Sequence, residues 1–410
     1  MGKKYIKYQI GAIAGTYLLY TTYTLIRNCF AASTAYMNLT PDQVGTVLST
    51  LAISYGISRP ITGLLADKIS PKLFTCFGLF ASAGASIFFA FSQNSIGLLC
   101  TISFICGFFQ SIGSPTSQKI LSVWFPKNRR GTIIGIWSTS KDMGKVLISA
   151  LVILSVSAFS LTKGNVSPIF ILVSIIGILI SIIAYFIIFN NPEDVNLKKI
   201  NEHTEENKTL LKNSKDYVLK NKAVWFLCFA GGASYCASVG IQTWIPMLLQ
   251  QTKGFSPADA TAGFGLFSLG AIPAVLILCF ISDAMLKGRR VNLILAALVL
   301  VFAAVLVYWF STDPTIIRVS IITCGALFMG VGGLGVALTV DAVPPFALGT
   351  AGGMIGFFEY ILGTVLATKL IGYLASATGS LNIGFYVILS AIVIEFICFL
   401  GLKSVEKARD

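Results

Sequence analysis

The feature that most constrains this chain is its succession of long apolar runs. The hydrocarbon core of a bilayer is about 30 Å thick, and a helix needs about 20 mostly apolar residues to cross it. On this measure the sequence contains twelve segments of spanning length, at 9–36, 43–66, 73–92, 96–122, 132–160, 167–190, 223–250, 258–282, 291–310, 316–340, 348–375 and 382–402. The first segment follows directly on the N-terminus, and we interpret it as a retained span. The sequence therefore predicts an all-α membrane protein with twelve transmembrane helices.

The charged residues agree with this prediction. They make up 11% of the 410 residues, whereas a soluble protein of this size carries about a quarter. The formal net charge of +13 could by itself indicate a nucleic-acid partner. However, the basic residues lie in short clusters between apolar runs, as they do in the cytoplasmic loops of membrane proteins. The composition argues against a soluble enzyme and against nucleic-acid binding.

The basic clusters also predict the orientation of the chain. They lie at both ends of the chain, after the second, fourth and eighth segments, and in a long polar interval from Asn190 to Lys222. The opposite connections are nearly uncharged, although Lys163, Lys253 and Arg318 lie on or near that side. By the positive-inside rule both termini are cytoplasmic. We expect an N-terminal half at 1–190, a cytoplasmic linker at 191–222 and a C-terminal half at 223–410.

The two halves share weak internal similarity. Asp67 follows the second segment as Asp283 follows the eighth, and Gly131 follows the fourth as Gly349 follows the tenth. The two pairs have nearly equal spacing, which indicates a duplication of six helices. Charged residues of these connections are expected to latch cytoplasmic loops as the halves rock, and not to touch substrate: Asp67, Asp283, Arg129 and Arg130.

Several motifs resemble the major facilitator superfamily and, within it, the organophosphate:phosphate antiporter family of glycerol-phosphate and hexose-phosphate carriers. The superfamily motif is GLLADKISPK after the second segment. The family motifs are YTLIRNCFAAS, SYGISRPITGLLAD, GFFQSIGSPTSQKILSVWFPKNRRGTIIGIWS and VDAVPPFALGTAGGMIGFFEYILGT. The resemblance implies the major facilitator fold, two pseudo-symmetric six-helix halves, and secondary active transport by alternating access.

The resemblance also implies roles for individual residues. Arg27 matches the substrate arginine of the first span, Arg59 a basic residue of the second, and Lys141 a histidine of the fifth. The partner arginine of the seventh span is missing, because Ser238 stands there, and Thr243 replaces an acid nearby. Exchange of a phosphate ester for phosphate and proton-coupled uptake of a carboxylate or a zwitterion such as an amino acid both stay open.

Ionisable side chains inside the membrane are costly, so each one is a candidate site residue. The planar guanidinium of Arg27 can hold a phosphate or carboxylate, or it can form a structural ion pair. Lys141 and Lys145 share one helix face, which indicates a negative group between them, unless Lys145 snorkels outward. Asp142 points about 100° away from Lys141 and is a better partner for another helix.

Glu359 is the pseudo-symmetry mate of Lys141. A buried carboxyl can act as a proton carrier, and a salt bridge to Arg59 is the equal alternative. Glu395 is interpreted as a packing or interface residue. Four polar side chains either bind substrate or serve helix packing: Tyr23, Ser114, Tyr235 and Gln242.

Other functional classes find little support. The nine cysteines lie in apolar stretches without a C-x-x-C pair and His203 is the one histidine, so we expect no metal site and no cofactor. Motifs of hydrolases and metalloproteases are absent from the sequence, which argues against an enzyme. A ligand sensor of the same fold would need a signalling surface, and an efflux pump for lipophilic cations would need acids in place of cations. We expect a monomeric transporter of a small organic anion in a bacterial cytoplasmic (inner) membrane, with inorganic phosphate or a proton as the coupling ion.

Overall fold

The computed structural model describes residues 3–92, 95–158, 162, 164–198, 218–284, 290–343 and 348–407. All named elements in these ranges are helices.

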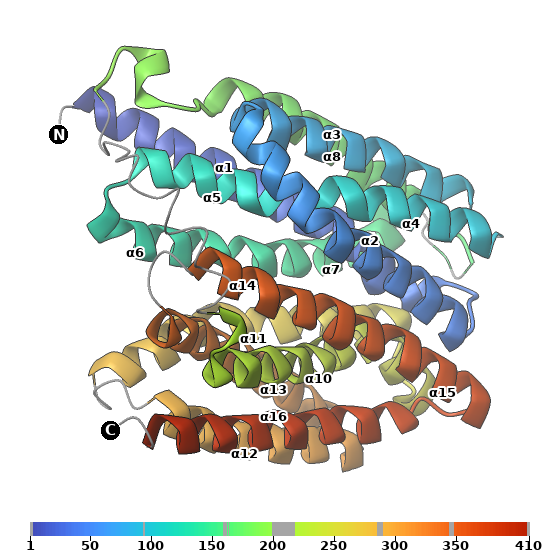
Figure 1. The fold of residues 1–410 in the computed structure, drawn as a ribbon. Helices are drawn as coiled ribbons and strands as arrows, with labels where there is room; N and C mark the ends of the chain where they lie inside the picture. The colour runs from blue at the N-terminus through green and yellow to red at the C-terminus, as the bar shows by residue number, and fades with distance from the viewer. Residues whose placement is uncertain are drawn as a thin grey trace. The chain divides into compact units, whose positions relative to one another are not determined.

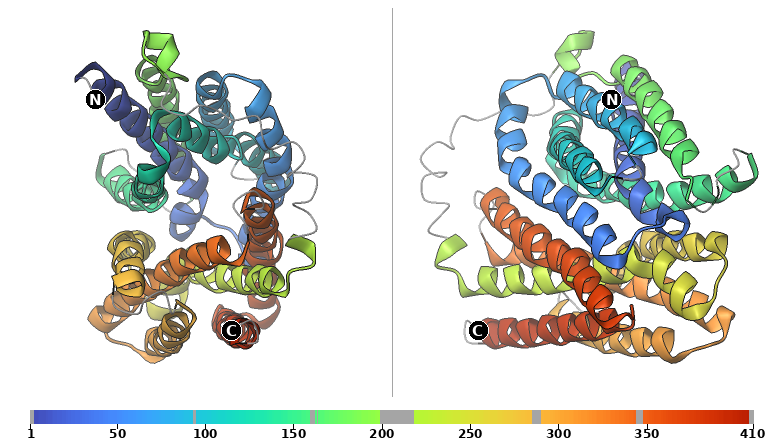
Figure 2. Two further views of the ribbon diagram at one scale, coloured as in Figure 1. Left: turned by 60° about the vertical axis from the view of Figure 1, so that its left-hand side comes forward. Right: turned by 90° about the vertical axis from the view of Figure 1, so that its right-hand side faces the viewer.

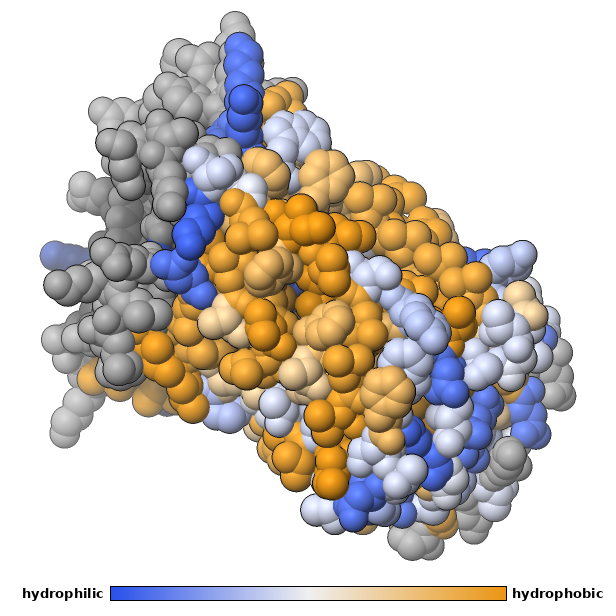
Figure 3. All heavy atoms as spheres, turned by 90° about the horizontal axis from the view of Figure 1, so that it is seen from below, coloured by the Kyte–Doolittle hydropathy of each residue, from blue (hydrophilic) through white to orange (hydrophobic). Residues whose placement is uncertain are grey.

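Nine of the described helical stretches are long and apolar enough to cross a membrane. Large side chains such as Phe91, Phe186 and Phe310 are 75%, 71% and 72% exposed, which suits lipid and not water. Figure 3 shows one face on which hydrophobic side chains form a broad area. The chain is an all-α integral membrane protein.

Each of the twelve predicted segments coincides, within the described ranges, with one helix or with consecutive helices (Figure 1). The first eight α-helices are α1 (Lys3–Ser33), α2 (Pro41–Lys68), α3 (Pro71–Ile87), α4 (Ile96–Gln110), α5 (Gly113–Trp124), α6 (Lys127–Ser138), α7 (Ser140–Ala158) and α8 (Ser167–Ile187). The later elements are α10 (Lys222–Lys253), α11 (Pro257–Ala284), α12 (Arg290–Phe310), α13 (Pro314–Ala342), α14 (Leu348–Phe357), η5 (Phe358–Thr364), η6 (Leu366–Leu370), α15 (Ile371–Thr378) and α16 (Ile383–Lys407).

Two compact units divide the chain. The first comprises 1–38 and 53–203, and the second comprises 39–52 and 204–410. In the first unit α1 packs against α5, α7 and α8, and α3 packs against α4 and α8 (Figure 2). In the second unit α10 packs against α11, α16 and η5, while α13 packs against α11 and α12. Helix α2 contributes its first part to the second unit and its remainder to the first.

A close crossing of α7 and α1 holds two predicted site helices together. Gly144 lies so near α1 that a Cβ atom there would collide with the hydroxyl of Thr24 and the carbonyl of Thr21. In lipid, small residues let helix backbones approach closely, and packing of this kind replaces the hydrophobic effect as the driving force. The crossing fixes the helix that carries Lys141 beside the helix that carries Arg27.

Three of the predicted segments are interrupted helices. The fourth breaks at residues 111–112, between α4 and α5, where Pro115 sits in the first turn of α5 and so removes no internal hydrogen bond. The fifth breaks at Thr139, between α6 and α7. The eleventh contains two π-helical runs, η5 and η6, and Glu359 lies in the first of them. Such irregular turns are frequent at functional sites.

Two of the three basic residues on the nearly uncharged side, Lys253 and Arg318, have partners in the structure, and Lys163 lies outside the described residues. The Nζ atom of Lys253 donates to the carbonyl oxygens of Trp309 and Ser311 at 2.5 Å and 2.8 Å. Arg318 forms an ion pair with Asp259 at 2.9 Å. These pairs tie α10 to the end of α12, and α13 to α11.

Candidate functional site

Arg27 of α1 is held in one orientation by two other helices of the first unit. Its Nε atom donates to the Oε1 atom of Gln110 at 2.7 Å, and its guanidinium carbon lies 4.3 Å from the centre of the Tyr55 ring. Gln110 is fully buried, and its Nε2 atom donates to the hydroxyl of Ser82 at 3.1 Å. A charged group is thus fixed in the membrane by a chain of hydrogen bonds that runs through α4 to α3.

A serine and two arginines lie around the hydroxyl of Tyr20. The buried Tyr20 hydroxyl shares a hydrogen bond with Ser114, and both Arg27 and Arg59 lie within electrostatic range of that hydroxyl. The side-chain amide of Gln118 also donates to Ser114, at 3.2 Å. Since Ser114 is the second residue of α5, just after the helix break, the interruption brings its hydroxyl to this place. The structure gathers the predicted residues Arg27, Arg59 and Ser114 around Tyr20.

The two lysines of α7 differ in their surroundings. Lys145 forms an ion pair with Asp142 at 3.2 Å, and Asp142 is only 4% exposed. The partner of Asp142 therefore lies on its own helix, three residues away, and not on another helix as the sequence had suggested. Lys141 is partly buried and makes no hydrogen bond or ion pair with the described residues. It is the lysine whose charge is not neutralised within this helix.

Tyr23 and Gln242 make hydrogen bonds between helices. The Tyr23 hydroxyl donates to the carbonyl of Thr75 at 2.7 Å, and its ring packs on Gly113. The Nε2 atom of Gln242 donates to the hydroxyl of Ser268 at 2.6 Å. These bonds match the packing alternative that the sequence left open for both residues.

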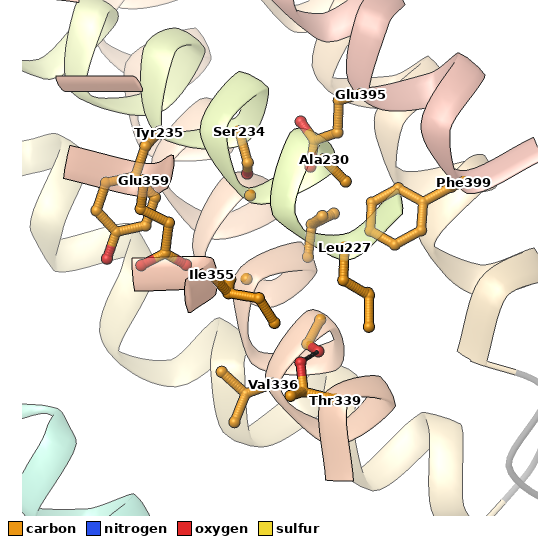
Figure 4. A pocket seen from close by; sticks show the side chains of 14 residues that line it. Leu227, Ala230, Ser234, Tyr235, Val336, Thr339, Ile355, Glu359, Glu395 and Phe399 are labelled. Atoms are coloured by element: carbon orange, nitrogen blue, oxygen red, sulfur yellow. Dashed lines mark hydrogen bonds between the residues drawn. The ribbon is translucent and has the colours of Figure 1, made fainter. Parts of the chain in front are cut away.

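In the second unit, Tyr235 and Glu359 line one cavity (Figure 4). The Tyr235 ring lies 5.7 Å from the ring of Tyr360. Ser238, at the place of the missing arginine, donates to the carbonyl of Ser234 at 2.7 Å within its own helix. A salt bridge of Glu359 with Arg59 stays a prediction, because the two residues belong to different units.

The predicted cytoplasmic latch lies outside the described side chains, as does His203. In the part of the chain that the structure describes, His, Cys, Asp and Glu residues form no group that could hold a metal ion. The latching of cytoplasmic loops stays a prediction for all four of these residues: Asp67, Asp283, Arg129 and Arg130.

Sequence reasoning missed three residues that surround Arg27, namely Tyr20, Tyr55 and Gln110. Gln110 could have been recognised from the sequence, since it is the one amide side chain in the apolar helix α4. A polar group in such a helix usually bonds to a neighbouring helix. The two tyrosines carried none, because aromatic residues are common throughout these spans.

Comparison with known proteins adds independent findings. The family model for the Major Facilitator Superfamily matches residues 10–368. The chain is 30% identical to a glycerol-3-phosphate transporter of Bacillus subtilis (strain 168), over 98% of this chain and 94% of the relative. It is 31% identical to a hexose-6-phosphate:phosphate antiporter of Escherichia coli (strain K12), over 95% of this chain and 89% of the relative. A solved bacterial homolog of the human lysosomal transporter Spinster has a similar fold, with a TM-score of 0.77, 14% identity, and coverage of 98% of this chain and 96% of that one.

Proposed function

Because this chain belongs to the major facilitator superfamily, whose members are secondary transporters, we propose that it exchanges an organic phosphate ester for inorganic phosphate. The observation that carries the proposal is the fixed guanidinium of Arg27. A planar guanidinium can hold two oxygens of one phosphate group, which makes arginine a favoured residue for phosphate recognition. The names of the similar transporters supply the substrate class.

A second positive charge in the same unit supports a doubly charged substrate. Lys145 is neutralised by Asp142, so the charge of α7 that acts on an anion is that of Lys141. Arg59 adds a further positive charge near Tyr20. An unneutralised cation inside a membrane, such as Lys141, is expensive, and a bound anion offsets that cost.

Lys141 also compensates for the missing arginine of the seventh span. Ser238 brings no charge to that span, and its hydroxyl bonds to its own helix. A histidine, as in the resembled family, is only partly charged near neutral pH, whereas a lysine carries a full charge. The full charge of Lys141 thereby replaces the positive charge that is missing at Ser238. The first unit provides most of the contacts to the phosphate.

The remaining features of the proposal follow from the topology. Two six-helix halves, 1–190 and 223–410, joined by the linker at 191–222, give alternating access by rocking. Both termini face the cytoplasm by the positive-inside rule, and the protein acts as a monomer in a bacterial inner membrane. Inorganic phosphate is the counter-substrate. Tyr235, Tyr23 and Gln242 serve packing around the path of the substrate.

The test is an exchange assay in liposomes loaded with inorganic phosphate. Labelled phosphate and glycerol phosphate should enter with the wild type. Arg27→Ala should reduce the rate about a hundredfold, since two hydrogen bonds to a charged group contribute about 3 kcal/mol and 1.4 kcal/mol corresponds to tenfold. Arg318→Ala is the matched control, because this arginine belongs to the second unit, is half-exposed and is paired with Asp259. Full exchange by Arg27→Ala would disprove the assignment.

A thermal-shift screen identifies the substrate class without transport. A ligand that binds the folded state raises the melting temperature by mass action. Sugar phosphates and glycerol phosphate should stabilise the wild type, while dicarboxylates and amino acids should not. Stabilisation by a dicarboxylate alone would reject the phosphate ester, and ligand binding without any exchange in liposomes would indicate a sensor.

A further inference from the structure

A second polar site lies in the C-terminal unit, within a cavity between α10, α13, α14, η5 and α16. The cavity has a volume of about 60 Å³ and is lined mostly by apolar side chains. Two carboxyl groups reach it, that of Glu359 from η5 and that of Glu395 from α16. Figure 4 shows the Glu395 carboxyl directed toward Ser234 and Ala230 of α10, with Glu359 on the other side of Ser234. Neither the proposed anion site nor the fold requires two acids at this place.

Glu395 is unusually poor in partners for a carboxyl group. It is 1% exposed, and its Oε2 atom has no hydrogen-bond partner. The Ser234 hydroxyl is the hydrogen-bonding side chain beside it. Burial of a charge without a partner is far more costly than burial of a neutral acid. This carboxyl can be neutral only if it holds a proton, and the proton would sit on an oxygen inside the cavity.

The chemistry of the lining favours a proton over a metal ion. A hard cation such as Ca²⁺ needs six to eight oxygen ligands, and Mg²⁺ needs six. Apart from the two carboxyls, the lining offers only the hydroxyls of Ser234, Tyr235 and Thr339, and that of Thr339 already donates to the carbonyl of Gly335. A proton needs a single oxygen. The residues that line the described cavity include no basic side chain.

Glu359 is placed to pass a proton to or from Glu395. Its Oε1 atom lies 3.5 Å from the position that a Cβ atom of Gly231 would occupy, an ordinary contact distance, so the Glu359 carboxyl lies against α10 at Gly231. Gly231 and Ser234 are one turn apart on the same face of α10. Glu395, beside Ser234, and Glu359, beside Gly231, therefore border neighbouring positions of one helix. One water molecule needs about 10–15 Å³ of such volume, so the cavity has room for water between them.

We propose that this cavity is a proton-binding site in which Glu395 carries the proton and Glu359 delivers or accepts it, so that substrate exchange is accompanied by proton movement. In the transfer, the O–H bond of the Glu395 carboxyl breaks and an O–H bond forms on Glu359, directly or through water. Among the described residues, ionisable groups near the two acids include the thiol of Cys228 and the phenols of Tyr235 and Tyr360. Cys398 lies beside Glu395 on α16. The side chains of α13 and α14 that line the cavity are not ionisable.

The first experiment measures protonation alone and needs no substrate. Infrared difference spectra of the purified protein in lipid nanodiscs, recorded across the neutral pH range, should show the C=O band of a protonated carboxyl. Glu395→Gln should remove this band, while Glu193→Gln, at an exposed acid outside the spans, should leave it. Ser234→Ala should shift its frequency, which supplies a reading if Glu395→Gln does not fold. An unchanged band in both Glu395→Gln and Ser234→Ala would overturn the assignment.

The second experiment tests the coupling, which rests on the proposed function. Liposomes that contain a pH dye and inorganic phosphate report protons moved per phosphate exchanged. Phosphate itself carries the same number of protons in every variant. A difference in the proton-to-phosphate ratio between variants therefore reports the protons that the protein moves. Glu395→Gln and Glu359→Gln should exchange phosphate with a lower proton-to-phosphate ratio. An unchanged ratio in both, or loss of exchange in both at every pH, would overturn the coupling. Absence of exchange in the wild type would reject the proposed function and leave the infrared result standing.

Discussion

Gln110 is a single amide in an apolar helix, and both ends of its amide group are used. Its oxygen accepts from Arg27 and its nitrogen donates to Ser82. In a medium without water, such a chain of hydrogen bonds restricts the guanidinium to one orientation. The residue therefore acts on the substrate only through Arg27, as a positioning residue.

Gln110→Leu and Gln110→Glu separate positioning from structure. Leucine removes a hydrogen bond to a charged group, which contributes about 1.5–3 kcal/mol, so the apparent phosphate affinity should fall about tenfold to a hundredfold. Glutamate can still accept from Arg27 but neutralises its charge, so the protein should keep its melting temperature while phosphate binding is lost. Exchange kinetics and thermal unfolding give both readings. Equal effects of the two substitutions on melting temperature and affinity would indicate a packing role only.

The pair of Asp142 and Lys145 gives a prediction about stability. Removal of one partner from a buried ion pair costs about 3–5 kcal/mol, because the other charge is left unpaired. The Lys145 side chain is 19% exposed, which places the expected loss near the lower value. Asp142→Asn should lower the melting temperature, and the double variant with Lys145→Met should recover most of the loss. Thermal unfolding in detergent measures both, and a double variant no more stable than the single one would contradict the pairing.

At the scale of elements, apolar length predicted the positions of the helices, since each predicted segment coincides with helix in the described ranges. The breaks within the fourth, fifth and eleventh segments were not predicted, because π turns and short gaps depend on how neighbouring helices pack. The sequence also contains the i,i+3 spacing of Asp142 and Lys145. The interpretation followed the i,i+4 spacing of Lys141 and Lys145 and therefore did not predict this ion pair. The bond between Arg27 and Gln110 spans 83 positions, and no local pattern reveals such a contact.

At the scale of the whole molecule, helix α2 has an unusual place. Residues 39–52 belong by their contacts to the second unit, whereas α2 from Ile53 onward belongs to the first. The start of α2 is tied to the last turns of the eleventh segment, since Lys369 bonds to Asp42 at 2.8 Å and to the hydroxyl of Thr46 at 2.7 Å. The proposed rocking of two halves therefore requires α2 to bend near Ile53 or to release these contacts.

A reversible cross-link at this junction tests whether the contacts must open. The backbone nitrogen of Asp42 donates to the hydroxyl of Ser376 at 2.9 Å, so cysteines at these two positions should come within reach of a disulfide. In the double variant Asp42→Cys and Ser376→Cys, oxidation should stop phosphate exchange and a reductant should restore it. Each single variant is the control, because the native cysteines that the structure describes are mostly buried. Exchange at the full rate in a sample that mass spectrometry shows to be cross-linked would mean that α2 bends while its first turns stay attached to the second unit.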